Sequence, residues 1–423
     1  MSARPLCWLI LFGAAFVPDR TLAADWPQWR GPNRDDVSLE TGLLKSWPAQ
    51  GPKQLWTFAE AGLGFSGPAV VGNRLYTMGA RGESEYVLAL DTATGKELWA
   101  TPIGPLFTNG WGDGPRGTPT VDGELLYGIG GEGDLICVEA AGGKKRWEIN
   151  LQRDLGGQMM SGWGYTESPL IDGDRLVCTP GGSRGTLAAL DKRTGTVIWR
   201  SSTATDPAAY SSAIIAEAGG MRQYVQMTGE GVIGVSARDG HLLWRSSQSA
   251  NGTAVIPTPL FHDGCAYVTS GYGAGCGLLK LEGGSAGIRA HTVYSNKIMT
   301  NQHGGVVLVN GNVYGYSDSG GWVCQDFKSG KALWTERRKL GKGSLTYADG
   351  HLYCYREDDG TVVLIETTPE GWHESGRFRI SQHTNQPRKN GRIWTHPVVA
   401  NGHLFLRDQD LIFCYDLMSR NGA

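Results

Sequence analysis

The stretch from Tyr86 to Trp99, Tyr-Val-Leu-Ala-Leu-Asp-Thr-Ala-Thr-Gly-Lys-Glu-Leu-Trp, decides the fold of this chain. Its apolar start, Tyr86 to Leu90, has the length of a short strand. Asp91 and Gly95 then bracket a turn, because the aspartate carboxylate accepts bonds from nearby backbone amides and glycine tolerates a positive φ. A second strand follows and ends on Trp99. The stretch therefore predicts two strands joined by a tight turn.

The same pattern returns along the chain, with the Asp, the Gly and the terminal Trp at matching places. The copies occupy Leu187–Trp199, Val235–Trp244, Val323–Trp334 and, more loosely, Ile136–Trp147. Units of about 40 to 50 residues with four strands each predict a β-propeller. We expect the strand-ending residues to dock between neighbouring blades: Trp56, Trp99, Trp147, Trp199, Trp244 and Trp334, with Tyr294 standing in where one Trp is missing.

The turns between the first two strands of each unit fix the number of blades at eight. Seven units carry an Asx-Gly or Gly-Asn turn, a strong hairpin signal, and the fourth carries Gly219-Gly220. The eighth unit stops after three strands, near Leu417, whereas Gln54–Phe58 reads as a fourth strand without partners. Pairing these two segments removes two exposed sheet edges. The sequence thus predicts an all-β, eight-bladed propeller whose last four-stranded blade is closed by the N-terminal strand.

The regions outside the repeats predict the domain organisation. Residues 1–23 have the basic start, the apolar core and the small residues of a signal peptide, with cleavage expected after Ala23. Cys7 lies inside the apolar core, so a lipid anchor is not expected. Residues 24–52 read as an irregular N-terminal arm that packs on the body, and residues 53–423 as a single propeller domain. We therefore expect an exported, periplasmic or extracellular monomer without a transmembrane segment.

Composition limits the classes of partner. The formal net charge is -2 and only 19% of the residues are charged, which argues against nucleic acid as a partner. Seven cysteines follow the leader at wide spacings, without a CxxC pair. We expect them to fill strands as small apolar side chains, the alternative being a disulfide framework. Nine scattered histidines give no metal-binding spacing, so the residues predict no metal site.

The motif Ala89-x-Asp91-x-x-Thr94-Gly95-x-x-x-Trp99 resembles the tryptophan-docking repeat of quinoproteins, the pyrroloquinoline quinone (PQQ) dehydrogenases. The same repeat builds the outer-membrane assembly factor BamB. The opening Trp26 to Asp35 is similar to the start of exported PQQ-like propeller proteins, and the resemblance covers essentially the whole mature chain. It implies a binding or scaffold protein that uses its axial funnel or its blade edges. The alternatives are a PQQ-dependent, alcohol dehydrogenase-like oxidoreductase and a carbohydrate-binding propeller, because one fold hosts several functions.

The loops that enter each blade are expected to gather around the axial funnel. Several carry exposed aromatic residues mixed with Arg, His and carboxylates, a pattern typical of sites for a planar or carbohydrate-like ligand or a peptide. The candidate ligand-binding residues are Trp111, Asp113, Arg116, Trp163, Tyr165, Glu167, Gln302, His303, Trp394 and His396. The same residues could instead plug the funnel, form an Arg116–Glu167 ion pair and cap backbone groups. No catalytic residue is assigned.

The quinoprotein resemblance also implies that this funnel could bind a cofactor, PQQ together with Ca²⁺. The planar quinone would be gripped by Trp163 or Trp394, and Arg116 would face one of its carboxylates. Glu167, with Asn301 as a second candidate, would help to hold Ca²⁺. The adjacent Cys-Cys pair of quinoprotein alcohol dehydrogenases does not occur in the sequence.

Overall fold

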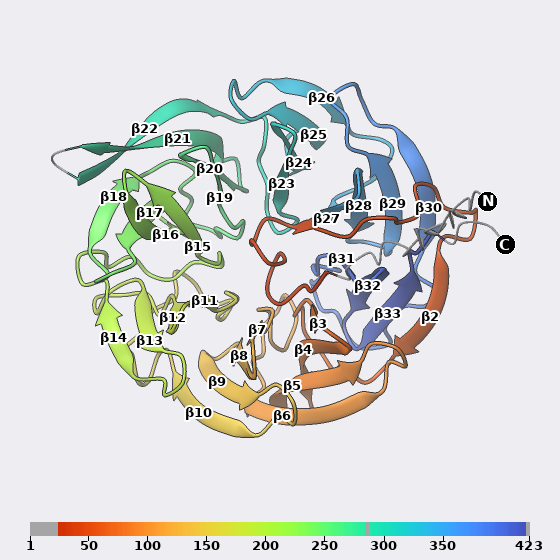
Figure 1. The fold of residues 1–423 in the computed structure, drawn as a ribbon, viewed down its shortest axis with the longest axis horizontal. Coiled ribbons are helices and arrows are strands. Elements are labelled where there is room, and N and C mark those ends of the chain that lie inside the picture. The colour runs from red at the N-terminus through yellow and green to blue at the C-terminus, as the bar shows by residue number, and fades with distance from the viewer. Residues whose placement is uncertain (1–23, 285–286, 420–423) are drawn as a thin grey trace, which may run out of the picture.

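The structure, a computed structural model, describes residues 24–284 and 287–419. The predicted signal peptide, residues 1–23, lies outside the described residues. Eight antiparallel sheets stand in a ring around a central axis, as Figure 1 shows. Strands account for the regular structure of the described part, which contains no helix that could cross a membrane. The predicted eight-bladed, all-β propeller is confirmed.

The first four blades follow the chain from the axis outward. Blade one contains β3 (Ala69–Val71), β4 (Arg74–Arg81), β5 (Ser84–Asp91) and β6 (Glu97–Pro105). Blade two contains β7 (Thr120–Asp122), β8 (Leu125–Ile129), β9 (Asp134–Glu139) and β10 (Lys145–Asn150). Blade three contains β11 (Leu170–Asp172), β12 (Arg175–Cys178), β13 (Ala188–Asp191) and β14 (Val197–Arg200). Blade four contains β15 (Ile214–Ala218), β16 (Met221–Thr228), β17 (Gly231–Ser236) and β18 (Leu242–Ser246).

The next four blades complete the ring. Blade five contains β19 (Leu260–His262), β20 (Cys265–Ser270), β21 (Gly275–Gly284) and β22 (Gly287–Asn296). Blade six contains β23 (Val306–Val309), β24 (Asn312–Ser317), β25 (Gly321–Asp326) and β26 (Ala332–Glu336). Blade seven contains β27 (Gly343–Ala348), β28 (His351–Arg356), β29 (Thr361–Glu366) and β30 (Glu374–Arg379). Blade eight contains β31 (Val398–Ala400), β32 (His403–Asp408), β33 (Leu411–Asp416) and β2 (Lys53–Phe58).

The two ends of the chain close the ring in blade eight. Strand β2 pairs antiparallel with β33, with Thr57 opposite Phe413 and Phe58 opposite Ile412. The strand therefore takes the outer position that the C-terminal part of the chain leaves open, as predicted. Closure in this way joins both chain ends to one sheet and removes the edge of β33.

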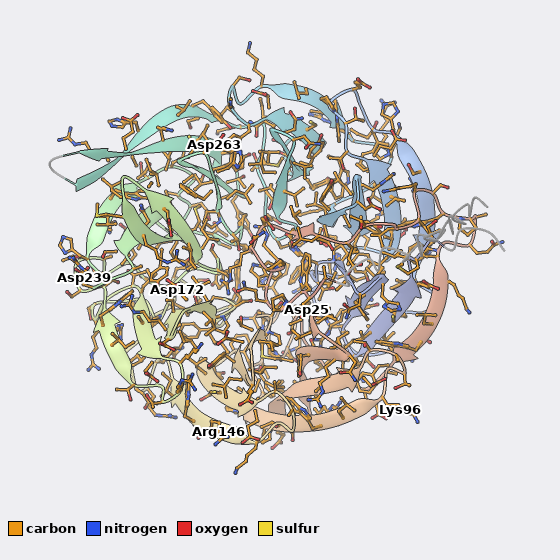
Figure 2. The ribbon with its side chains drawn as sticks, in the orientation of Figure 1. Asp25, Lys96, Arg146, Asp172, Asp239 and Asp263 are labelled. Atoms are coloured by element: carbon orange, nitrogen blue, oxygen red, sulfur yellow. The ribbon has the colours of Figure 1, made fainter. Side chains whose placement is uncertain are left out.

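Apolar side chains fill the spaces between the blades, and charge gathers on the outside. Strands such as β17 and β29 are buried along nearly their whole length, because each sheet is covered on both faces by its neighbours. Figure 2 shows Lys96, Arg146 and Asp239 at the outer rim of the ring. The seven cysteines have free thiols, and six of them are buried in strands, as expected for small apolar filler.

Glycine and tryptophan make the repeated contact between blades. The indole of Trp56 lies against Gly95 of the next blade, where an added Cβ would come within 2.7 Å of the ring. Its Nε1 donates to the Thr92 carbonyl at 2.8 Å. Gly95 has a φ of 70°. Glycine is therefore required here because it has no Cβ to collide with the indole and because it tolerates a positive φ. The same contact recurs in the pairs Trp99 with Gly143, Trp147 with Gly195, Trp199 with Gly240 and Tyr294 with Gly330.

Trp244 does not follow this pattern. The next blade replaces the short third turn with the long hairpin β21–β22, which reaches out beyond the ring in Figure 1. Trp244 therefore has no turn glycine to meet. Its Nε1 donates to Gln223 of its own blade, and the ring lies against Gly234.

Blade seven receives its docking tryptophan from the N-terminal arm (residues 24–52). Gly376 occupies the register position that Trp99 has in blade one. A Cβ on Gly376 would lie 2.7 Å from the Cβ of Trp47, so the Trp47 side chain fills the empty place. Trp47 contacts Tyr353 with ring centroids 5.8 Å apart, much as Trp99 contacts Tyr76 at 6.0 Å. The sequence pattern alone did not assign this role to Trp47.

The N-terminal arm also runs through the centre of the ring, where Figure 1 shows it in red. Residues 26–38 of the arm contact four blades: Trp26 bridges Val70 of blade one, and Pro27 accepts a hydrogen bond from Val121 of blade two. Strand β1 (Val37–Ser38) adds to β27 of blade seven in parallel. The Ser38 hydroxyl donates to the Val399 carbonyl of blade eight at 2.7 Å.

Two arginines of the N-terminal arm reach the remaining four blades. Arg34 donates to the carbonyls of Ser168 and Pro169 in blade three and of Ala213 in blade four. Arg30 donates to the carbonyls of Thr258 in blade five and Val306 in blade six. The arm thus contacts all eight blades, which explains why it is ordered despite its irregular backbone.

Replacing Trp47 tests whether the arm completes the blade contacts. Trp47 is 8% exposed, so Trp47→Ala should lower the free energy of unfolding by about 3–5 kcal/mol, as for other buried aromatic truncations. Trp111→Ala, at a side chain that is 46% exposed, is the matched control and should cost much less. Chemical denaturation of both variants measures the difference. Equal losses would show that Trp47 is not a docking residue.

Candidate functional site

A cavity of about 370 Å³ opens on the axis at the end where the loops enter the blades. Its volume lies at the lower end of the roughly 300–1,000 Å³ range of ligand pockets. The loops before the first strands of seven of the eight blades contribute to its lining. Its aromatic lining residues are Trp29, Phe65, Trp111, Trp163, Tyr210, Tyr272 and Trp394.

The floor of this axial cavity comes from the N-terminal arm. Trp29 Nε1 donates to Thr258 Oγ1 at 2.9 Å, and the Trp29 ring lies 4.5 Å from that of His396. Arg30 Nε lies 2.7 Å from Asp36 Oδ2, and both side chains are fully buried. Arg30 and Asp36 adopt the left-handed φ values of 61° and 59°, which such residues rarely take. The arm therefore holds a strained backbone in order to place Trp29 and Arg30.

His396 links the floor to the wall. Its Nδ1 lies 3.1 Å from Asp36 Oδ2, and its Nε2 lies 2.8 Å from the His303 carbonyl oxygen. His396 thereby connects the arm residue Asp36 to the loop that carries His303.

His303 and Trp394 form one wall of the cavity, and both contact the carboxylate of Glu357. Glu357 Oε2 accepts a hydrogen bond from Trp394 Nε1 at 3.1 Å and lies 2.9 Å from His303 Nε2, off the line of a hydrogen bond. Burial lowers the pKa of His303 even though Glu357 acts against the shift. Burial alone would raise the pKa of Glu357, but His303 and Lys342 hold it below its usual value. Phe65 extends the wall, with its ring 5.1 Å from Trp394.

Arg116 lines the cavity with its guanidinium packed on aromatic rings. The guanidinium carbon lies 4.7 Å from the centre of Phe107 and 5.5 Å from that of Phe65. It donates to the carbonyls of Gly112 at 2.6 Å and Gly114 at 2.7 Å. Burial lowers the pKa of Arg116 to about 10, so the side chain keeps its charge at neutral pH. The ion pair between Arg116 and Glu167, which was the alternative interpretation, does not form, because Arg116 binds these carbonyls and Glu167 accepts from the Thr179 amide.

Seven of the ten predicted ligand-binding residues line the cavity: Trp111, Arg116, Trp163, Gln302, His303, Trp394 and His396. The other three lie elsewhere. Asp113 pairs with Lys389 at 2.6 Å near Trp111. Tyr165 is in the core and donates to the Pro180 carbonyl at 2.9 Å. Glu167 is buried and accepts a hydrogen bond from the backbone amide of Thr179, and burial raises its pKa to about 7.

The residues present do not fit the Ca²⁺ site that the quinoprotein resemblance implies. None of the described residues lining the cavity is Asp or Glu, whereas Ca²⁺ prefers six to eight oxygen ligands. Glu167 points at a backbone amide outside the cavity, and the Asn301 side-chain amide donates to the carbonyls of Gly305 and Tyr316. Residues 24–284 and 287–419 contain no group of three His, Cys, Asp or Glu that could hold a metal ion.

Sequence reasoning missed twelve lining residues, among them all the remaining aromatic and cationic ones: Trp29, Arg30, Phe65, Tyr210 and Tyr272. Tyr210 and Phe65 precede first strands, as the predicted residues do, so the same loop argument could have found them. Tyr272 comes from the turn between β20 and β21 and has a φ of 57°. Such left-handed residues gather at binding sites, but the sequence does not reveal the backbone angle. Trp29 and Arg30 enter the site only because the arm threads the axis.

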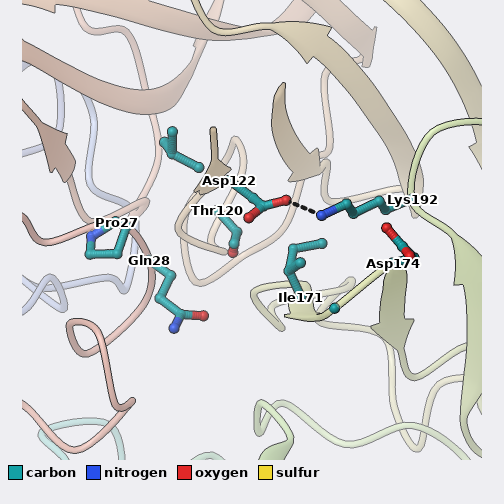
Figure 3. A pocket seen from close by; sticks show the side chains of 9 residues that line it. Pro27, Gln28, Thr120, Asp122, Ile171, Asp174 and Lys192 are labelled. Atoms are coloured by element: carbon teal, nitrogen blue, oxygen red, sulfur yellow. Dashed lines mark hydrogen bonds and ion pairs between the residues drawn. The ribbon is translucent and has the colours of Figure 1, made fainter. Parts of the chain in front are cut away.

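A second, shallower cavity lies among the turns at the other ends of blades two and three. Figure 3 shows Pro27 and Gln28 of the N-terminal arm on one side and Lys192 and Asp122 on the other. Lys192 Nζ lies 2.5 Å from Asp122 Oδ2, so this cation is already neutralised. The lining contains no aromatic side chain. The axial cavity is therefore the stronger candidate for a ligand site.

The family model described as "Outer membrane protein assembly factor BamB" matches residues 83–336. The chain belongs to this family. The BamB-type match runs from the third strand of blade one to the last strand of blade six, and so covers the docking pairs from Trp99–Gly143 to Tyr294–Gly330.

Individual relatives agree with the BamB-type assignment. BamB of Burkholderia pseudomallei is 24% identical over 393 residues, covering 89% of this chain and 91% of that protein. BamB of Shewanella oneidensis is 26% identical over 233 residues, and the match spans about half of each protein, 53%. The dehydrogenase subunit of the quinone alcohol dehydrogenase of Komagataeibacter europaeus is 35% identical over 132 residues, which cover 28% of this chain and 17% of the enzyme.

Among solved structures, BamB from Moraxella catarrhalis superposes with a TM-score of 0.60 at 15% identity. The superposition covers 86% of this chain and all of the Moraxella protein. At this identity the likeness establishes the shared propeller fold.

The buried Glu167 predicts a pH dependence of stability. Its pKa is raised from 4.5 to about 7 in the folded protein, so the folded state keeps a proton that the unfolded chain loses. The free energy of unfolding should therefore fall as the pH rises from about 4.5 to 7, by on the order of 3 kcal/mol from this group. Glu167→Gln cannot ionise and should flatten this slope, whereas Glu60→Gln, at an exposed site, should leave it unchanged. Urea denaturation across the pH range measures both, and identical slopes in the two variants would contradict the assignment.

Proposed function

We propose that this BamB-type propeller is an exported binding protein that holds part of a ligand or partner in its axial cavity without transforming it. The family match supports a scaffold or assembly-factor architecture. The signal-peptide pattern of residues 1–23 supports export. The finer points, which ligand and which partner, rest on the cavity itself.

The observation that carries the proposal is the chemistry of the cavity lining. Seven aromatic side chains offer flat apolar surfaces in a space the size of a small ligand pocket. The basic side chains Arg30, Arg116 and His396 of the lining are engaged with fixed protein partners: Arg30 with Asp36 and backbone carbonyls, Arg116 with carbonyls, and His396 with Asp36. Such groups shape a binding site, but they provide no nucleophile with an adjacent general base.

A quinone-dependent oxidoreductase is the alternative with some support, because a short segment is 35% identical to part of a quinone alcohol dehydrogenase. The cavity lacks the oxygen ligands for the Ca²⁺ that this reading requires. Binding of a carbohydrate on the tryptophan faces remains within the proposed function, since sugars also stack on flat aromatic surfaces.

A panel of glycans and small aromatic compounds tests the proposal by direct binding. We expect at least one class to bind, with affinity reduced tenfold or more in Trp163→Ala, because an aromatic contact is lost from the cavity wall. Ile198→Ala, at a side chain that is 47% exposed on the outer strand β14, is the control and should bind normally. Binding that survives Trp163→Ala, or alcohol-dependent dye reduction after addition of PQQ and Ca²⁺, would contradict the proposal.

A further inference from the structure

Three hydroxyl groups lie side by side on the floor of the axial cavity. Ser168, Ser212 and Thr258 hold the same position in three successive blades, just before the first strand, and all three line the cavity. Each residue is at least 97% buried in the protein. Because the three come from neighbouring blades, the ring arrangement brings their side chains to one part of the floor.

Each of these hydroxyls keeps a hydrogen that it can donate. Their oxygens already accept N–H groups: Ser168 from the Thr118 amide at 2.8 Å, Ser212 from the Ser168 amide at 2.9 Å, and Thr258 from the Trp29 indole at 2.9 Å. Within residues 24–284 and 287–419 no acceptor is found for the three hydroxyl hydrogens. A hydroxyl carries one hydrogen to donate, so each can still bond to an acceptor on a ligand.

The charged residues of the lining also favour a ligand that carries acceptor oxygens. Arg30, Arg116 and the imidazole of His396 line the cavity, and no carboxylate does. The nearest carboxylates lie behind the lining, Asp36 beneath Arg30 and Glu357 behind His303 and Trp394. In a partly buried site of low dielectric, a lining whose charged groups are guanidinium cations favours an anion and disfavours an ammonium group.

The walls above this floor are flat and apolar. Trp111, Trp163 and Tyr210 form one aromatic group, with ring centroids 6.5 Å and 5.6 Å apart. Phe65, Trp394 and His303 form a second group, with ring centroids 5.1 Å and 5.6 Å apart. A ligand that enters between them is contacted by ring faces and edges along its body and meets the three hydroxyls at its inner end.

We infer that the axial cavity selects a compact organic anion, with the acid group on the hydroxyls of Ser168, Ser212 and Thr258 and a flat body among the tryptophans. This inference rests on the proposed binding function and specifies its ligand class. The acid can belong to an aromatic carboxylate or to an acidic sugar, since both present acceptor oxygens beside a face that stacks. No bound metal is needed, because the donors come from the protein.

Matched pairs of probes test the preference for acids with the full-length mature protein. 2-Naphthoate against 2-naphthamide, and phenyl β-D-glucuronide against phenyl β-D-glucoside, differ mainly in the acid group. We expect the acid of at least one pair to bind tenfold or more tightly than its neutral partner in isothermal titration, and the pair that responds identifies the source. Equal affinities, tighter binding of the neutral members, or binding by no probe would overturn the inference. If the affinities are equal or the neutral members bind more tightly, the proposed binding function still stands. If no probe binds, the panel of glycans and small aromatic compounds decides whether the protein has that function.

Substitutions on the floor locate the acid group. Thr258→Val and Ser212→Ala should each lower the acid-to-neutral affinity ratio by roughly tenfold while the neutral probe keeps its affinity. Thr118→Val is the control, because Thr118 has the same position in blade two and is buried, but does not line the cavity. Thermal unfolding confirms that each variant is folded. A ratio that changes equally in Thr118→Val and Thr258→Val would show that the floor does not bind the acid.

Discussion

The buried ion pair of Arg30 with Asp36 on the axis is the interaction on which the rest of the structure depends. Charges removed from water are costly unless partners surround them. Here the Arg30 guanidinium meets a carboxylate and two backbone carbonyls from different blades, and Asp36 also meets His396. Arg34 repeats the arrangement with carbonyls of blades three and four, and keeps its charge although burial lowers its pKa to about 9. The inner strands are therefore tied at the centre as well as packed at their faces.

The contacts of the N-terminal arm on the axis also form the binding cavity. An open ring of eight blades leaves a gap along its axis, and here the N-terminal arm fills it. The backbone turn that brings Arg30 to Asp36 places the Trp29 indole across the axis, where it becomes the cavity floor. The same arm then supplies Trp47 to blade seven, and the strand that follows it, β2, completes blade eight. Residues 24–58 thus close the ring, complete the blade contacts and set the depth of the site.

Much of the fold could be predicted because short local sequence patterns determine it. The Asx-Gly turns and the spaced tryptophans report strand ends directly, and the unpaired strand at Gln54–Phe58 reports the closure. The cavity loops were also predictable, since entry loops gather at one end of a propeller. Trp29 and Trp47 were not, because their roles depend on where an irregular segment runs. Glu167 was misplaced for a related reason: the residue lies in an entry loop, but its side chain turns to the Thr179 amide in the core.

Hydrogen–deuterium exchange of an Arg30→Met, Arg34→Met variant tests the central role of the arm most directly. The two arginines bind carbonyls of blades three to six, so their loss should speed exchange at the amides of the inner strands β11, β15, β19 and β23 together. Strands β29 and β33, whose blades are held by β1 and Ser38, should keep their protection. Faster exchange confined to residues 24–38, with the inner strands unchanged, would contradict the account.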